Sequence, residues 1–136
     1  LLERQKYTKK QIKTKLQSKG YLDEVIEKTI EKLINYKFID DINYVECYIN
    51  SSPNKSKKEL RFNLLNKGVS STIIDKILDE NEVDEENRVR NLANKYLKNK
   101  EKNSGNIQKM IAYLYRKGFE YSVVSKIAHE FNFDEF

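Results

Sequence analysis

The chain has 136 residues, of which 35% are charged and 38% hydrophobic, and its formal net charge is +5. Four glycines and one proline are too few for the many turns of an all-β fold, and no apolar run approaches the roughly eighteen residues of a membrane span. The single cysteine, Cys47, excludes an internal disulfide and favours a reducing, cytoplasmic setting. The composition therefore predicts a helical protein with much surface per residue.

The first predicted elements are a basic helix over residues 8–19 and an acidic helix over residues 22–35. Residues 1–6 are interpreted as the remnant of a truncated helix that precedes them. The pair Lys19-Gly20 is typical of a helix C-terminus, because glycine readily adopts the left-handed conformation and lysine interacts favourably with the negative end of the helix dipole. Carboxylates at Asp23-Glu24 suit the start of the second helix.

The same order then recurs twice, with a linker helix in front. The first linker helix is opened by Asp40-Asp41 and the second by Asp84, and loops are expected over residues 51–54 and 99–106. The later basic helices are predicted over residues 55–67 and 106–117, and the later acidic helices over residues 70–80 and 120–131.

These recurrences form an internal repeat. Each copy places apolar residues eight and four positions before a Lys-Gly pair, one directly after it, and others at the fifth, sixth and tenth positions after it. The glycines are Gly20, Gly68 and Gly118. We therefore expect an all-α fold of three tandem three-helix repeats in an elongated, curved array, the first helix of repeat 1 being truncated. The expected repeats cover residues 1–36, 37–83 and 84–136.

Charge follows the repeat. The three basic helices carry net charges of +5, +4 and +3, whereas the three acidic helices carry −2, −2 and −1. Basic helices at equivalent places would line one side of a stacked array and suit a polyanionic or acidic partner. The alternative is an ordinary solvated face. The candidate partner-binding residues are Lys9, Lys10, Lys13, Lys57, Lys58, Arg61, Lys109 and Arg116.

No arrangement typical of a catalytic or metal site is present. His129 is the only histidine, Cys47 has no cysteine or histidine near it in the sequence, and neither common phosphate-binding glycine loop occurs. We expect no enzyme, no metal and no cofactor. Base stacking is an alternative use of the aromatic residues, but their spacing favours the core. These aromatic residues are Tyr36, Phe38, Tyr44, Tyr48, Tyr113, Tyr115, Phe119 and Tyr121.

The ordered series of motifs resembles the bacterial RecX regulators. It consists of the basic helix, the Lys-Gly-aromatic turn and the acidic helix, then Phe38-Ile39-Asp40-Asp41, Ser56-Lys57-Lys58-Glu59-Leu60, and finally Arg116-Lys117-Gly118-Phe119. The resemblance implies a modular three-helix repeat protein that binds the RecA recombinase and its filament on single-stranded DNA. It also implies inhibition of ATP hydrolysis and strand exchange, and no catalytic residue of its own.

Expected partners are thus the RecA filament and, non-specifically, single- or double-stranded DNA, with no membrane and a monomeric state. Two other functions remain open. One is direct nucleic-acid binding of the helix-turn-helix type, in which the second helix enters the groove. Here that second helix is acidic in every copy, which opposes base readout. The other is a helical scaffold for a different protein.

Overall fold

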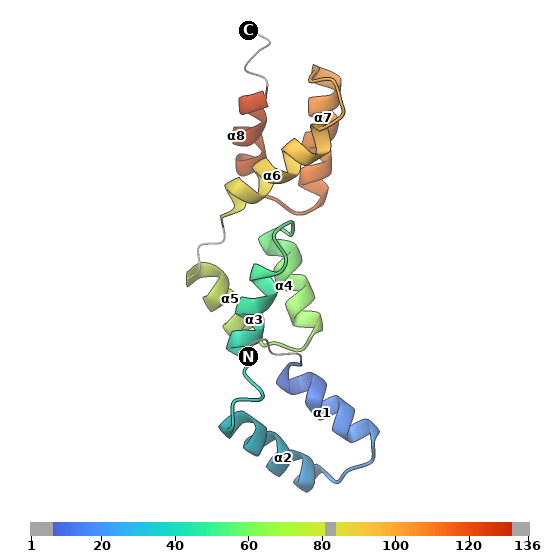
Figure 1. Cartoon of the computed structure of the whole chain (residues 1–136), viewed down its shortest axis with the longest axis vertical. Helices are drawn as coiled ribbons and strands as arrows, with labels where there is room; N and C mark the ends of the chain where they lie inside the picture. The colour runs from blue at the N-terminus through green and yellow to red at the C-terminus, as the bar shows by residue number, and fades with distance from the viewer. Residues whose placement is uncertain (1–6, 81–83, 132–136) are drawn as a thin grey trace. The chain divides into compact units, whose positions relative to one another are not determined.

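The computed structural model describes residues 7–80 and 84–131, and within these ranges it contains eight α-helices and no strand (Figure 1). The helices are α1 (Lys9–Ser18), α2 (Asp23–Asn35), α3 (Asp41–Asn50), α4 (Lys57–Asn66), α5 (Ser71–Glu80), α6 (Glu85–Leu97), α7 (Ser104–Arg116) and α8 (Tyr121–Phe131). The predicted all-α fold is confirmed. The helix remnant predicted over residues 1–6 lies outside the described residues.

The chain forms two compact units. Unit 1 consists of Leu1–Ser52 with Arg61–Asn81, and unit 2 consists of Pro53–Leu60 with Glu82–Phe136. The division falls inside α4, after Leu60. The repeat boundaries and the curvature of the array remain predictions.

Local side-chain caps explain where several helices begin. Thr8 precedes α1 and forms a capping box, in which its hydroxyl accepts from the Gln11 amide and the Gln11 side chain accepts from the Thr8 amide. The predicted starts at Asp40 and Asp84 are confirmed, because each carboxylate accepts a backbone N–H three residues later. Before α2, Leu22 makes no side-chain cap, and the carboxylates of the first turn act on the dipole instead.

The predicted helix ends at the Lys-Gly pairs are also confirmed. Gly20, Gly68 and Gly118 have φ values of +85°, +96° and +99°, in the left-handed region that favours glycine. A similar turn ends α2, but there the left-handed residue is Lys37, with φ of +62°. The Phe38 amide then donates to the Leu33 carbonyl at 2.8 Å.

Two start predictions were wrong by two residues. The second basic helix was expected from Lys55, whereas α4 begins at Lys57, after the Ser56 cap. We expected the third basic helix to begin at Asn106, whereas α7 begins at Ser104, two residues or roughly half a turn earlier. Asn103 is the cap, because its side chain accepts from the Asn106 amide at 2.9 Å. Asn106 consequently lies within the first turn of the helix.

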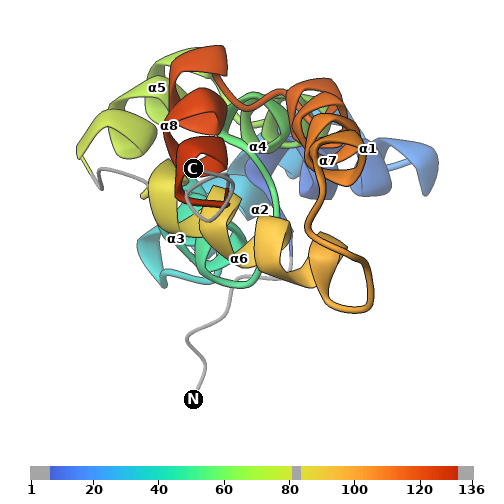
Figure 2. The ribbon, with the colours of Figure 1, turned by 90° about the horizontal axis from the view of Figure 1, so that it is seen from above.

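Helices α6, α7 and α8 form a complete three-helix copy in unit 2. Figures 1 and 2 show α6 lying across both α7 and α8, and residues of all three helices share one buried core. That core consists of Val89, Leu92, Ala93, Leu97, Ile107, Met110, Leu114, Phe119, Val124, Ile127 and Ala128. In unit 1, α1 packs on α2 around Ile26, Ile30 and Ile39, and α3 packs on α5.

The assignment of the aromatic residues to the core was only partly correct. Tyr44 and Phe119 are buried, and Tyr48 and Tyr113 are half-buried. The assignment was wrong for the exposed aromatic residues, which are Tyr36, Phe38, Tyr115 and Tyr121. Spacing alone failed there because these side chains lie at helix ends and in turns. The regular inward-facing stripe of a helix does not extend to such positions.

Candidate interaction surface

Two buried hydroxyl groups join successive copies in the same way. In unit 1 the Thr8 hydroxyl donates to the Lys67 carbonyl at 2.6 Å, and in unit 2 the Ser56 hydroxyl donates to the Lys117 carbonyl at 2.8 Å. Each hydroxyl caps a basic helix, and each carbonyl belongs to the Lys-Gly pair of the next copy. Both side chains are fully buried, as a hydrogen-bonded polar group can be.

A backbone hydrogen bond accompanies each hydroxyl. The Lys9 amide donates to the Asp41 carboxylate at 3.0 Å, and the Lys57 amide donates to the Glu85 carboxylate at 2.9 Å. Asp41 and Glu85 are the first residues of the linker helices α3 and α6. A carboxylate at the N-terminus of a basic helix is favourable, because free amides and the positive end of the dipole meet there.

Lysine side chains complete the arrangement. A Cβ atom placed on Gly68 would lie 2.6 Å from the Cβ of Lys10, and one placed on Gly118 would lie 3.2 Å from the Cβ of Lys58. The aliphatic stems of these lysines therefore pack directly on the glycines. We call the hydroxyl bond, the amide–carboxylate bond and this lysine–glycine contact the inter-repeat joint.

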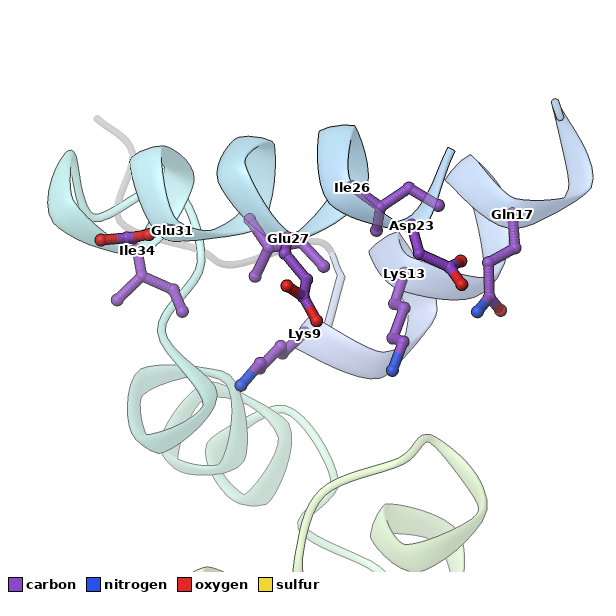
Figure 3. Close-up of a pocket in the computed structure, with 9 residues that line it drawn as sticks. Lys9, Lys13, Gln17, Asp23, Ile26, Glu27, Glu31 and Ile34 are labelled. Atoms are coloured by element: carbon purple, nitrogen blue, oxygen red, sulfur yellow. The ribbon is translucent and has the colours of Figure 1, made fainter. Parts of the chain in front are cut away.

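A groove between α1 and α2 contains two of the candidate residues. It has a volume of about 450 Å³, and Ile26 and Ile30 form its apolar floor. Figure 3 shows Lys9 and Lys13 reaching from α1 into the groove, with the Glu27 carboxylate extending toward the same space from α2. These two lysines therefore share their surroundings with carboxylates of their own repeat.

In the second copy the corresponding charges form an ion pair. Arg61 Nε lies 2.8 Å from Asp75 Oδ1, and a second contact joins Nη2 to Oδ2 at 3.4 Å. Relative to the glycine of each copy, Arg61 corresponds to Lys13 and Asp75 to Glu27. The Arg61 hydrogen bond lowers the pKa of the Asp75 carboxyl, and Asp75 raises the pKa of the Arg61 guanidinium.

Unit 2 holds the remaining candidates. Lys57 and Lys58 line a second groove, of about 530 Å³, together with Glu85, Tyr115, Gly118, Phe119, Glu120 and Tyr121. We call it the tyrosine groove. Lys109 and Arg116 are exposed on α7 and have no ion-pair partner in the described part of the chain. The structure thus brings together Lys9 with Lys13 and Lys57 with Lys58.

Sequence reasoning missed the two tyrosines of this groove as surface residues. The alignment of the copies contained the signal, because Tyr121 corresponds to Asp23 and Ser71, and Tyr115 corresponds to Gln17 and Leu65. The position of Tyr121 is polar in both other copies and that of Tyr115 is polar in one, which indicates that these positions face solvent. Spacing within one helix does not carry this information.

The described residues lack both a membrane span and a metal cluster. No helix among them is both long and apolar enough to cross a membrane. No group of three or more histidine, cysteine, aspartate or glutamate side chains in those ranges is arranged to hold a metal ion.

Two family profiles match the chain. Residues 1–33 match "RecX, first three-helix domain", and residues 84–127 match "RecX, third three-helix domain". Among curated proteins, the chain is 33% identical to "Regulatory protein RecX" of Clostridium botulinum over 95% of its own length and 64% of the relative's. It is 32% identical to "Regulatory protein RecX" of Clostridium acetobutylicum over 90% of its own length and 61% of the relative's.

Solved structures show the same relationship. The crystal structure of RecX from Lactobacillus salivarius superposes with a TM-score of 0.80 and 28% identity, over 93% of this chain and 86% of that one. A second crystal structure, of a regulatory protein RecX, gives a TM-score of 0.72 and 29% identity over 90% of this chain and 64% of that one. The chain spans a little under two thirds of the curated relatives described above, at 64% and 61%.

Proposed function

Because the chain belongs to the RecX family, we propose that it is a non-catalytic, cytoplasmic regulator that binds RecA and its filament on single-stranded DNA. Bound there, it inhibits ATP hydrolysis and strand exchange in recombination and repair. The observation that carries the proposal is the match to RecX proteins along the chain, together with a solved RecX structure of the same fold.

Recurring basic helices support a periodic partner. The helices α1, α4 and α7 each carry exposed cations, and exposed charge raises the rate at which oppositely charged surfaces meet. We propose that the eight candidate residues contribute to this contact. Lys13, Lys109 and Arg116 test the idea most cleanly, because each is exposed and has no ion pair or hydrogen bond within the described residues.

The test is the steady-state ATPase activity of RecA on single-stranded DNA, with this protein added at substoichiometric amounts. We expect inhibition by the natural chain and weaker inhibition by the triple variant Lys13→Glu, Lys109→Glu and Arg116→Glu. A matched triple variant, Lys28→Glu, Lys32→Glu and Lys76→Glu, changes the net charge equally on the acidic helices and should inhibit normally.

Two outcomes would contradict the proposal. A chain that binds bare DNA tightly and leaves RecA unaffected is a direct nucleic-acid-binding protein. Equal loss of inhibition in both triple variants would mean that net charge, rather than the basic helices, directs binding. Charge reversal at Lys58 or Arg61 is a poorer test, because Lys58 packs in the joint and Arg61 pairs with Asp75.

A further inference from the structure

We propose that the tyrosine groove of unit 2 is a docking site for a protein segment that presents an arginine or lysine side chain. Tyr115 and Tyr121 are 60% and 65% exposed. Their ring centroids are 6.4 Å apart and their planes nearly perpendicular, at 89°. Such an edge-to-face pair is held by its own ring contact, so it offers aromatic surface to a partner without having to be ordered on binding.

The groove has the form of a small binding pocket. Its volume of about 530 Å³ is enough for a few side chains, and the buried ring of Phe119 belongs to its lining. Gly118 lies under the Lys58 stem and is fixed by the inter-repeat joint. The turn between the two tyrosines is therefore braced from one side, which favours a preformed site.

Charge decides the kind of partner. The lining contains two lysines, Lys57 and Lys58, and two carboxylates, Glu85 and Glu120. Grooves that bind single-stranded nucleic acid are dominated by positive charge, whereas this one is balanced. Mixed charge around exposed aromatic residues is typical of protein interfaces, where tyrosine is enriched among the residues that contribute most to affinity.

The free carboxylate of Glu120 favours a cationic side chain as the occupant. Its carboxylate is exposed, and in the described part of the chain it has no hydrogen bond or ion pair. Along the chain, Glu120 follows Tyr115 and directly precedes Tyr121, and all three residues line the groove. A guanidinium or ammonium group placed on a tyrosine face gains a cation–π interaction, and a nearby carboxylate strengthens its binding.

The site occurs once among the three copies. At the positions of Tyr115 and Tyr121 the first copy has Gln17 and Asp23, and the second has Leu65 and Ser71. Basic helices recur in every copy and fit a periodic partner in more than one register. A single aromatic site fixes one register. The inference thus deepens the proposed function, on which it rests for the identity of RecA as the partner.

The experiment measures equilibrium binding of the full chain to RecA filaments and, in parallel, to bare single-stranded oligonucleotide. We expect Tyr115→Ala, Tyr121→Ala and Glu120→Lys each to weaken filament binding about tenfold or more. Tyr121→Phe should bind nearly as the natural chain does, because the aromatic face is kept. Tyr36→Ala removes a tyrosine that is 72% exposed in unit 1 and should change nothing.

Each result has one meaning. Filament binding by the natural chain, with no loss in the alanine and lysine variants, overturns the groove and leaves the proposed function standing. No filament binding by the natural chain overturns the proposed function and this assignment of its partner. Loss of oligonucleotide binding with unchanged filament binding makes a nucleobase the occupant and overturns the inference. Circular dichroism confirms that every variant is folded.

Discussion

Three glycines that share one backbone conformation differ in what surrounds them. Each has a left-handed φ, so alanine at any of them costs about 1–2 kcal/mol from the backbone alone. A Cβ on Gly20 would meet nothing within 4 Å, whereas one on Gly68 would lie 2.6 Å from the Cβ of Lys10. We expect Gly68→Ala to destabilise the chain clearly more than Gly20→Ala, as measured by urea unfolding. Equal losses would mean that the lysine contact contributes nothing.

The Arg61–Asp75 pair should make stability depend on acid pH. The pKa of Asp75 is lowered from its ordinary value of 3.8 in the folded chain, mainly by the Arg61 hydrogen bond. The ion pair stabilises the folded chain fully when the pH is above the ordinary pKa of the carboxyl. This stabilisation is lost as the pH falls through the lowered pKa of the folded state. Asp75→Asn should remove that part of the pH dependence in urea unfolding between about pH 5 and pH 2.

The size of this effect will be small, since the two side chains are 45% and 51% exposed and salt screens the pair. Asp79→Asn is the matched control, because Asp79 lies on the same helix and has no arginine partner in the described residues. An identical pH profile for the natural chain and Asp75→Asn would show that the ion pair does not persist in solution.

Lysines show how far sequence reasoning reaches at this scale. Counting charges assigned the cations to the basic helices, where Lys13 and Lys109 are exposed. It did not predict that the stem of Lys58 covers Gly118, or that Arg61 faces Asp75. Both contacts depend on which helices pack against each other, and a count of charges does not contain that information.

At the scale of helices, a buried cap that also joins two copies should contribute more to the free energy of unfolding than a cap that serves its own helix alone. Ser56→Ala removes a cap and also the hydrogen bond to the Lys117 carbonyl. Loss of a cap costs about 1 kcal/mol, and the lost second bond adds roughly another 1 kcal/mol. We expect Asn103→Ala, which removes a cap and otherwise only a long, exposed 3.5 Å hydrogen bond to Glu101, to lose about half as much in thermal or urea unfolding.

A result in which Asn103→Ala and Ser56→Ala are equally destabilising would contradict this reading of the joint. Thr8→Ala is the parallel test in unit 1 and should behave like Ser56→Ala, because Thr8 makes the corresponding bond to Lys67. Ser56→Thr keeps the hydroxyl and should retain most of the stability.

Helix boundaries were predictable where one cap candidate stood alone. Asp84 satisfied that condition, and at Asp40-Asp41 either carboxylate places the start within one residue; Asp40 and Asp84 are the caps that the structure has. Before α7 two asparagines stand three residues apart, and either suits a cap. The local sequence could not choose between Asn103 and Asn106, so the earlier start was missed.

For the whole molecule, the proposed binding to RecA should weaken as salt rises. Charge on the basic helices acts over distances that salt shortens, from a screening length of about 10 Å at 0.1 M to about 3 Å at 1 M. We expect the dissociation constant for the filament to increase steeply with salt for the natural chain, and less steeply for the Lys13, Lys109 and Arg116 triple variant. A salt-independent constant would contradict electrostatic attraction by these helices.

The repeat, its charge pattern and the three-helix copies were all predictable, because they depend on periodicities written along the chain. The joint was not. It connects residues 59 and 61 positions apart through hydroxyl groups and backbone carbonyls. Every residue has a carbonyl, so no pattern marks Lys67 or Lys117 as the acceptor. The tyrosine groove escaped for a related reason, since it is assembled from the starts and ends of several helices.

The joint also gives a rule for building longer proteins from this one. Its receiving side needs a carbonyl, a glycine and a carboxylate at the start of the linker helix, and its donating side needs a hydroxyl cap with a lysine two residues later. Helix α7 breaks that rule, because Asn106 stands at the position of Ser56 but inside the first turn. An engineer who wished to add a copy behind the third would first have to shorten α7 and introduce both Asn106→Ser and Gln108→Lys.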